Sequence, residues 1–373
     1  MSQEALAILR EGNALAQTLT FEQLEAYHVP FDDLTGQQSV EHQVKYWAAR
    51  QGRMALIGQS GAGKSSVLAS VFGAFNEDLP DGLVPTRIPV AIAGESTIVD
   101  IGGFGRHLVK HILTWAAPEA LSDAEREGLE RQLARMESRT GKRRRAGFSL
   151  GTGSLLPIDA SLSADLAGAA SDFETALDNG DVVRAIKRLV ALFRARNLEP
   201  FFVFDDTDAW LRLPGQEKAT DRLATGFFSK NVRMLSREID CGFALAVHRS
   251  YLGLPAYQQV AESLEAIEIP RFPDSDAAIR AILQRRIDVD ELSVALEDAF
   301  TDAAIAALAG AYADVPDLRK VMATAGLAVR KVYDDADSHI VTEQAIIAAR
   351  AERDTLRVAR SDHYQPRTRF SRW

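Results

Sequence analysis

The segment at residues 58–65, which reads GQSGAGKS, constrains the chain more than any other feature. It fits the pattern G-x-x-x-x-G-K-[ST], in which glycines let backbone N–H groups turn inward around phosphate groups. The N-terminus of the following helix adds a dipole that favours negative charge. A strand-like apolar run at 54–57 precedes the segment, and a helix-like run at 66–69 follows it. This segment, called the phosphate loop below, therefore predicts a site for a nucleoside triphosphate.

The positions of the phosphate loop have separate expected roles. Lys64 is expected to reach the β- and γ-phosphates, and Ser65 to bind Mg²⁺. The other contacts to the nucleotide are expected from the rest of the motif and the residue after it: Gly58, Gln59, Ser60, Gly61, Ala62, Gly63 and Ser66. The alternative, a chance glycine-rich turn, is disfavoured because the match lies between a strand-like and a helix-like run.

The composition is that of a globular protein, with 46% hydrophobic and 25% charged residues among 373. Such a length allows one large domain or two smaller ones with a sizeable core. The single cysteine, Cys241, lies in an apolar run and has no partner for an intramolecular disulfide, which suits a reducing cytosol. No apolar run reaches the roughly 18 to 20 residues that span a bilayer, and no signal-peptide layout is present. We expect a cytoplasmic protein without membrane contact.

Positive charge is concentrated in two places, although the net charge is −9. The first cluster is Lys142, Arg143, Arg144 and Arg145. The second is the tail at residues 353–373, which is rich in arginine from Arg357 onward. Both clusters can contact the phosphate backbone of duplex DNA or an acidic neighbour. The negative net charge of the whole chain does not attract either partner. These clusters are therefore the candidate contacts for a partner.

Strands and helices are predicted to alternate up to about residue 270. Helices are expected at 3–17, 20–27, 64–73, 104–116 and 181–196, with a loop at 29–37. Beyond the apolar run at 54–57, strands are expected at 90–93, after a proline-rich stretch, and at 200–204, 242–247 and 264–269. Residues 117–180 break the rhythm and are interpreted as an insertion with a β-hairpin, either a solvated excursion or a partner-binding element. The alternation is typical of a parallel sheet.

Paired acids follow the strand prediction at 200–204, where the chain reads FFVFDD. The four apolar residues cannot lie on the surface, so Asp205 and Asp206 are expected at the carboxyl edge of the sheet, where α/β folds bind ligands. We assign Asp205 to Mg²⁺, through its water shell, and Asp206 to activation of the attacking water. The alternatives are a surface acidic turn and, for the nearby Asp208, a helix cap.

Polar residues also follow the strand predicted at 242–247. His248 can contact the γ-phosphate or the attacking water, or it is only a hydrogen-bonded residue at the edge of the core. Arg249 can stabilise charge in the transition state within its own subunit or across a subunit interface. Both roles of Arg249 stay open at this point.

Together these motifs resemble those of an AAA+ ATPase over residues 30–350. The resemblance takes in FDDLTGQ ahead of the phosphate loop, GQSGAGKS as Walker A, FFVFDD as Walker B, His248 as sensor 1 and the helical pattern after 274 as a lid. The stretch at 269–287 resembles the transition into that lid, and PDLRK at 316–320 resembles sensor 2 of the replication initiators. The resemblance implies that Arg319 contacts the nucleotide and couples the lid angle to nucleotide state. The alternative is that Arg319 is a solvated arginine on a helix.

The chain departs from this family pattern in three places. Asp206 stands where most members have glutamate, which resembles the KAP and STAND signalling ATPases and suggests slow hydrolysis. No arginine-finger box follows His248, and Arg249 is the only arginine between His248 and Pro270. With about twenty residues after the lid, we expect no winged-helix domain of the kind that replication initiators carry.

We therefore expect an α/β fold in which a P-loop three-layer αβα parallel sheet, the AAA+ core, is followed by an all-α helical lid. The expected domains are an N-terminal helical segment at 1–28, a nucleotide-binding domain at 29–270 with the insertion at about 117–180, a lid at 271–352 and the basic tail at 353–373. The expected activity is hydrolysis of ATP with Mg²⁺, coupled to assembly of a homo-oligomer or to binding of duplex DNA. The alternative is a slow signalling switch that acts on a protein effector, for example in a bacterial defence system. Phosphorylation of a small molecule is disfavoured, because a long lid with Arg319 fits mechanical coupling better than a substrate pocket.

Overall fold

The computed structural model describes residues 2–11, 14–16, 19–36, 39–73, 77–88, 101–112, 182–205, 207, 217–289, 294–335 and 339–363. These residues form two compact units. The sheet unit comprises His42–Gly58 and Phe75–Glu268, and the helical unit comprises Met1–Glu41, Gln59–Ala74 and Ile269–Trp373. The predicted domain limits stay a prediction. The strand predicted at 90–93, the inserted hairpin, Asp206 and the cluster at 142–145 lie outside the described residues.

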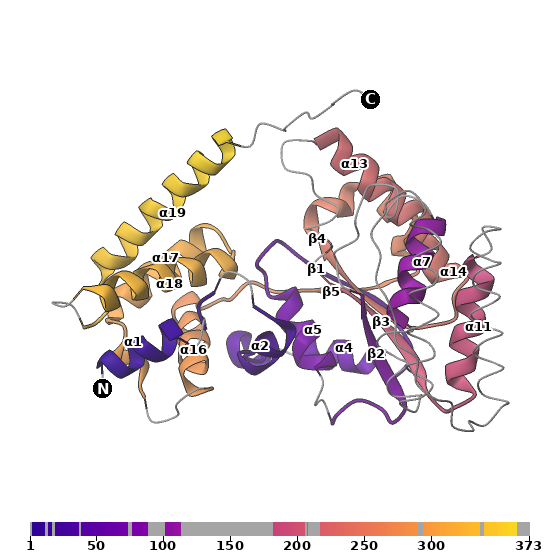
Figure 1. Ribbon diagram of the computed structural model, residues 1–373, viewed down its shortest axis with the longest axis horizontal. Helices are drawn as coiled ribbons and strands as arrows, with labels where there is room; N and C mark the ends of the chain where they lie inside the picture. Colours follow the sequence, from indigo (N-terminus) through magenta and orange to yellow (C-terminus); the bar gives the residue numbers. More distant parts are fainter. Residues whose placement is uncertain are drawn as a thin grey trace, which may run out of the picture. The chain divides into compact units, whose positions relative to one another are not determined.

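The sheet unit is built on five parallel strands in the order β2-β3-β4-β1-β5 (Figure 1). The strands are β1 (Arg53–Gly58), β2 (Leu83–Ile88), β3 (Glu199–Phe204), β4 (Phe243–His248) and β5 (Glu265–Glu268). Five of the six residues in each of β1, β3 and β4 are buried, so these central strands are covered on both faces. Such continuous burial is typical of parallel sheets in α/β proteins, and the α/β class is confirmed.

Helices pack on one face of this sheet through an apolar core. They are α7 (Ile101–His111), α11 (Val182–Arg194), α13 (Glu217–Gly226), the π-helix η2 (Phe227–Val232), α14 (Arg233–Arg237) and α15 (Pro255–Ala261). In α11 the buried residues Ile186, Leu189, Val190 and Phe193 recur at helical spacing and form one apolar stripe. The ring of Phe104 on α7 stacks on that of Phe204 on β3, with the ring centroids 6.0 Å apart. Each such buried side chain contributes roughly 1.5–3 kcal/mol.

The helical unit contains the phosphate-loop helix and the C-terminal helices. Its helices are α1 (Ser2–Glu11), α2 (Phe21–Ala26), α3 (Phe31–Thr35), α5 (Lys64–Phe72), α16 (Ser275–Asp288), the 3-10 helix η4 (Leu296–Asp298), α17 (Asp302–Asp314), α18 (Leu318–Asp334) and α19 (Glu343–His363). Side-chain caps set several of their starts: Thr20 forms a capping box with Gln23, and Asp274, Thr301 and Asp317 cap α16, α17 and α18. In the part of the chain that the structure describes, no helix is both long and apolar enough to cross a bilayer.

Two local predictions are corrected by the structure. The loop expected at 29–37 contains the short helix α3, which ends at Gly36 with a φ of 64°. The next helix, α4 (Val40–Ala48), was not predicted and belongs to the sheet unit from His42 onward. A strand, β2, lies inside the proline-rich stretch, where no strand is predicted. Proline is tolerated there because β2 is the edge strand among the described strands, so the missing N–H of Pro85 removes no bond to a described neighbour on the open side.

Candidate functional site

The phosphate loop connects β1 to α5 through backbone turns that require glycine. Gly61 and Gly63 have φ values of 72° and 102°, a region that side-chain-bearing residues rarely adopt. A Cβ atom on Gly61 would lie 2.1 Å from Asp317 Oδ1, and one on Gly63 would lie 3.1 Å from Phe31 Cζ. No side chain caps the N-terminus of α5. This backbone is suited to holding an anion, because turned N–H groups and the positive end of a helix dipole favour negative charge.

Lys64 folds back over this loop. Its Nζ donates a hydrogen bond of 2.9 Å to the Gln59 carbonyl, and the residue is only 7% exposed. Ser65 and Ser66 follow in the first turn of α5 and are half-buried. The cation that the sequence assigned to phosphate binding therefore lies at the loop itself.

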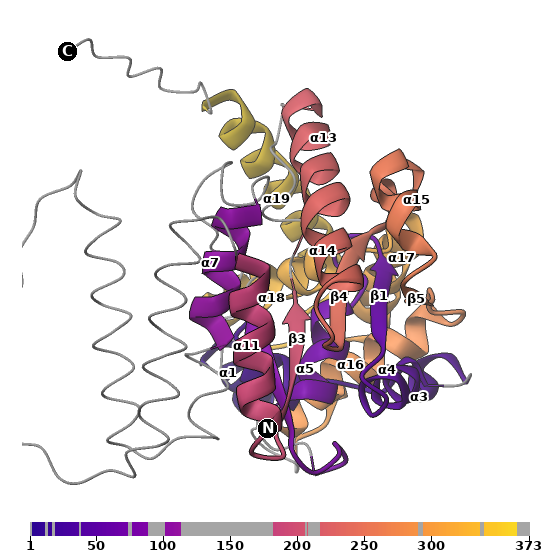
Figure 2. The same cartoon turned by 90° about the vertical axis from the view of Figure 1, so that its right-hand side faces the viewer.

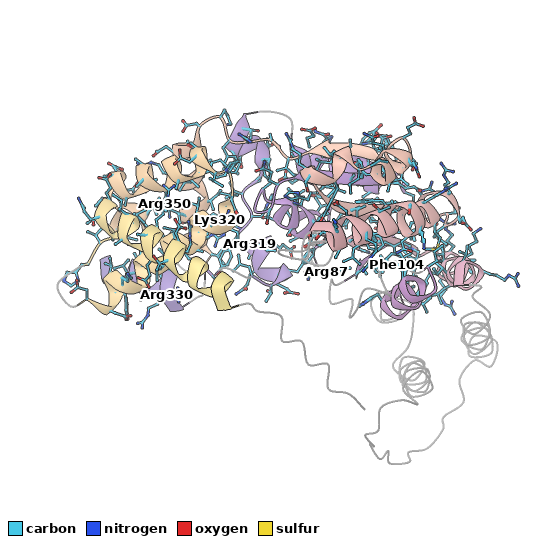
Figure 3. All side chains as sticks on the ribbon, turned by 90° about the horizontal axis from the view of Figure 1, so that it is seen from above. Arg87, Phe104, Arg319, Lys320, Arg330 and Arg350 are labelled. Carbon is cyan, nitrogen blue, oxygen red and sulfur yellow. The ribbon has the colours of Figure 1, made fainter. Side chains whose placement is uncertain are left out.

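The first turn of α18 contacts the phosphate loop within the helical unit. The Leu318 N–H donates to the Gly61 carbonyl at 3.0 Å. The buried Asp317 carboxylate lies against Gly61, accepts a hydrogen bond from the Lys320 N–H at 3.1 Å and forms an ion pair of 3.0 Å with Lys320 Nζ. Arg319 lies exposed in this first turn, next to Lys320 (Figure 3). The predicted sensor 2 segment and the phosphate loop are thus neighbours. The contact of Asp317 with Gly61 was missed, although an aspartate before LRK is a recognisable helix cap.

Replacing Gly61 by alanine is expected to lower the free energy of unfolding by roughly 1–3 kcal/mol, since it forces a left-handed backbone on alanine and displaces the Asp317 carboxylate. Thermal unfolding checks this. The matched control is Gly310→Ala in α17, where a Cβ meets nothing within 4 Å. This substitution should raise the free energy of unfolding by roughly 0.5–1 kcal/mol. Equal stability of the Gly61 variant and the parent would contradict the described loop.

A buried polar network that the sequence analysis did not find lies beside α5. It joins His28, Glu41 and Ser66, whose side chains come from three segments of the helical unit. Its only sequence signal is a histidine and a glutamate flanking the FDDLTGQ stretch, and neither position is informative by itself.

In the sheet unit, the strand order brings three candidate residues to one edge. Gly58 at the end of β1 is in register with His248 at the end of β4, and β4 lies between β1 and β3 (Figure 2). Asp205 follows β3 and is 3% exposed. The β3–β4 ladder ends at Phe204, and the Thr207 hydroxyl then donates to the Ala246 carbonyl. This bond ties the acidic segment to the strand that carries His248.

The hydrogen bonds of His248 determine its tautomer. Its Nδ1 lies 3.2 Å from the Ser250 N–H and 2.7 Å from Ser250 Oγ. A backbone N–H can only donate, so Nδ1 acts as the acceptor and the neutral ring carries its hydrogen on Nε2. His248 is half-exposed at the carboxyl edge of the sheet, where Nε2 is its N–H donor.

Arg249 forms an ion pair of 2.7 Å with Glu268. Glu268 is in register with Ile57 of β1, so the arginine reaches from the end of β4 past β1 to β5. Both side chains are exposed, at 48% and 62%. Exposed pairs contribute about 0–1 kcal/mol, so this one holds the guanidinium only weakly.

The predicted site residues are distributed over both units. The helical unit holds residues 59–66 and Arg319, and the sheet unit holds Gly58, Asp205, His248 and Arg249. A comparison with protein-family models finds no match to the chain, and a comparison with curated proteins finds none either.

Proposed function

We propose that the protein is an ATPase of the AAA+ type that binds ATP with Mg²⁺ and hydrolyses it. The observation that carries this proposal is the backbone of the phosphate loop, in which two glycines with positive φ lead into a helix that begins at Lys64. The parallel sheet whose strand β1 runs into this loop is compatible with a P-loop three-layer αβα core. The helices α16 to α19 would then form the lid.

The residues present fit a triphosphate and its metal ion. Gly61 and Gly63 carry no side chain, and a Cβ there would meet Asp317 or Phe31, so both turns require glycine and bring backbone N–H groups to the loop. Lys64 bonds a backbone carbonyl that it can exchange for phosphate oxygens. Ser65 and Asp205 would hold Mg²⁺, which usually keeps several waters and takes one or two protein ligands beside the phosphates. The ion would neutralise charge on the phosphate oxygens.

The chain's own side chains supply the remaining chemistry. Asp206 would accept the proton of the attacking water as general base. The Nε2–H of His248 would donate to a phosphate oxygen, and Arg319 would supply positive charge to the transferring phosphoryl group. Arg249 would do the same, in its own subunit or in a neighbouring one, after leaving its weak pair with Glu268.

The test is ATP binding and phosphate release by the full chain, with and without Mg²⁺. We expect release that depends on Mg²⁺ and on the phosphate loop. Failure to bind ATP at millimolar concentration would overturn the proposal. Transfer of the γ-phosphate to a metabolite rather than to water would replace it with a kinase function.

We further propose that nucleotide state controls assembly of a homo-oligomer on duplex DNA. Duplex DNA is expected to raise ATP turnover, and replacing Lys142, Arg143, Arg144 and Arg145 by alanine is expected to abolish this stimulation without changing basal turnover. The physical reason is the loss of phosphate contacts. Each contact contributes about 0.9 to the slope of the logarithm of the binding constant against the logarithm of the salt concentration. A matched control replaces four exposed cations elsewhere, Lys218, Arg222, Arg233 and Arg237. Absence of DNA binding at low salt with ATP and Mg²⁺ present would contradict the DNA proposal.

A second candidate function is a slow switch whose output is a protein effector. Asp206 favours it, because aspartate is one methylene shorter than the glutamate of most AAA+ proteins and places the base farther from the water. Turnover that duplex DNA leaves unchanged, together with nucleotide-dependent binding of a protein, would favour this candidate.

A further inference from the structure

We infer that His28 and Glu41 form a clamp that positions the phosphate-loop helix through Ser66 and thereby sets the affinity for nucleotide. The inference rests on the proposed function. It assigns a positioning role to two residues far from the loop in the sequence, neither of which belongs to the motifs described above.

A chain of hydrogen bonds forms the clamp. His28 Nε2 lies 2.7 Å from Glu41 Oε1, and His28 Nδ1 lies 2.8 Å from Ser66 Oγ. The His28 and Glu41 side chains are only 6% and 8% exposed. Ser66 directly follows Ser65 in the first turn of α5. The chain of bonds therefore ends beside the proposed metal ligand.

The charge of Glu41 sets the direction of these bonds. Burial opposes ionisation of Glu41, but hydrogen bonds from His28, from Ser39 and from the backbone outweigh it, so the pKa of the carboxyl is lowered. The ionised carboxylate can only accept, so Nε2 of His28 carries a hydrogen. In the neutral ring Nδ1 then accepts from the Ser66 hydroxyl, and in the charged ring it donates to the same oxygen. The bond to Ser66 persists in either state.

The same carboxylate also supports the loop from the other side. The Phe31 N–H donates to Glu41 Oε1 at 3.2 Å, and the Phe31 ring packs against Gly63. The ring is anchored in turn by Phe272, whose centroid is 5.8 Å away. Glu41 thus supports the loop at two points: through Phe31 at Gly63, directly before Lys64, and through His28 at Ser66, directly after Ser65. The two residues assigned to phosphate and metal lie between them.

This arrangement favours positioning over bulk stability. Burying charged and polar groups costs solvation energy that an apolar cluster of similar volume would not lose, so such a network is weak evidence of stabilisation. What it supplies is a fixed geometry, and small displacements of binding groups have large effects. Loss of the clamp is therefore expected to act on nucleotide binding more than on chemistry.

The test compares Ser66→Ala, Ser66→Thr and His28→Ala with the parent, using the dissociation constant of a fluorescent ATP analogue together with KM and kcat. Ser66→Ala and His28→Ala are expected to raise the dissociation constant and KM about tenfold each, as loss of one buried hydrogen bond does. His28 is not among the expected nucleotide contacts, so His28→Ala should leave kcat nearly unchanged. The double variant should be no worse than either single one, because both remove the same bond. Ser66→Thr, which keeps the hydroxyl, should bind like the parent.

Two controls separate the possible failures. Ser229→Ala removes a serine hydroxyl that donates to the Thr225 carbonyl of its own helix region, and it should bind like the parent. Amide hydrogen exchange without nucleotide should be faster at residues 64–68 in Ser66→Ala. If the parent binds ATP and Ser66→Ala binds equally well, the inference is wrong and the proposed function stands. Equal weakening by alanine and threonine at position 66 also overturns it, and a parent that binds no ATP overturns the proposed function itself.

Discussion

Replacing Lys64 by alanine is expected to weaken ATP binding by about 100-fold and to abolish hydrolysis at physiological ATP concentration. The ammonium group would form charge-assisted hydrogen bonds with the phosphates, and losing such bonds costs roughly 1.5–3 kcal/mol. Lys64 is buried and already directed over the loop by its bond to Gln59, so little side-chain entropy remains to be lost on binding. Isothermal titration with ATP and Mg²⁺ measures the effect.

The control for this variant is Lys331→Ala in α18. Lys331 forms a surface pair with Glu352 and is 43% exposed, so the same substitution there should leave nucleotide affinity unchanged. An equal loss of affinity in both variants would mean that net charge, rather than a specific contact, governs binding. Unchanged affinity in Lys64→Ala would contradict the assignment of residues 58–65 to the phosphates.

Replacing Asp206 by asparagine is expected to reduce ATP hydrolysis by about 100- to 10,000-fold, the usual contribution of a general base. ATP binding should be retained, because the amide keeps the shape of the side chain and removes a negative charge near the phosphates. Asp206→Glu is the informative companion. If the short reach of aspartate limits turnover, the glutamate variant should hydrolyse ATP faster than the parent. Both variants are compared with the parent by measuring steady-state phosphate release and the affinity for ATP.

Asp205→Asn and Asp240→Asn complete the series. Asp205 would hold Mg²⁺, so its variant should lose both hydrolysis and the dependence of affinity on Mg²⁺. Asp240 is a surface acid that pairs with Arg194, and its variant should behave like the parent. Hydrolysis at the parent rate in Asp206→Asn would show that the base is another residue.

The strands and helices next to the motifs were predictable because their patterns are local. The apolar run before Asp205 forms β3 within one residue of its predicted limits, and the run at 54–57 lies inside β1. The helix expected at 181–196 is α11, whose apolar stripe has helical spacing. These predictions are confirmed, since burial of a short continuous run leaves few alternatives.

β2 could not be predicted in the same way. Prolines and a turn signal dominate residues 80–89, and they ordinarily exclude a central strand. Among the described strands, β2 lies at the edge of the sheet with β3 as its neighbour, and this position makes Pro85 acceptable. Strand position within a sheet is a long-range property, and no window of a few residues contains it.

The local shape of the phosphate loop follows from the residues themselves, because glycines at Gly61 and Gly63 permit left-handed turns and the residues after them favour a helix. The neighbours of the loop were decided only when the chain folded. His248 came to lie beside Gly58, Leu318 bonded to Gly61, and Glu41 reached Ser66 through His28. The physical reason is that these contacts join residues separated by 13 to more than 250 positions, whose meeting depends on the packing of whole helices and strands.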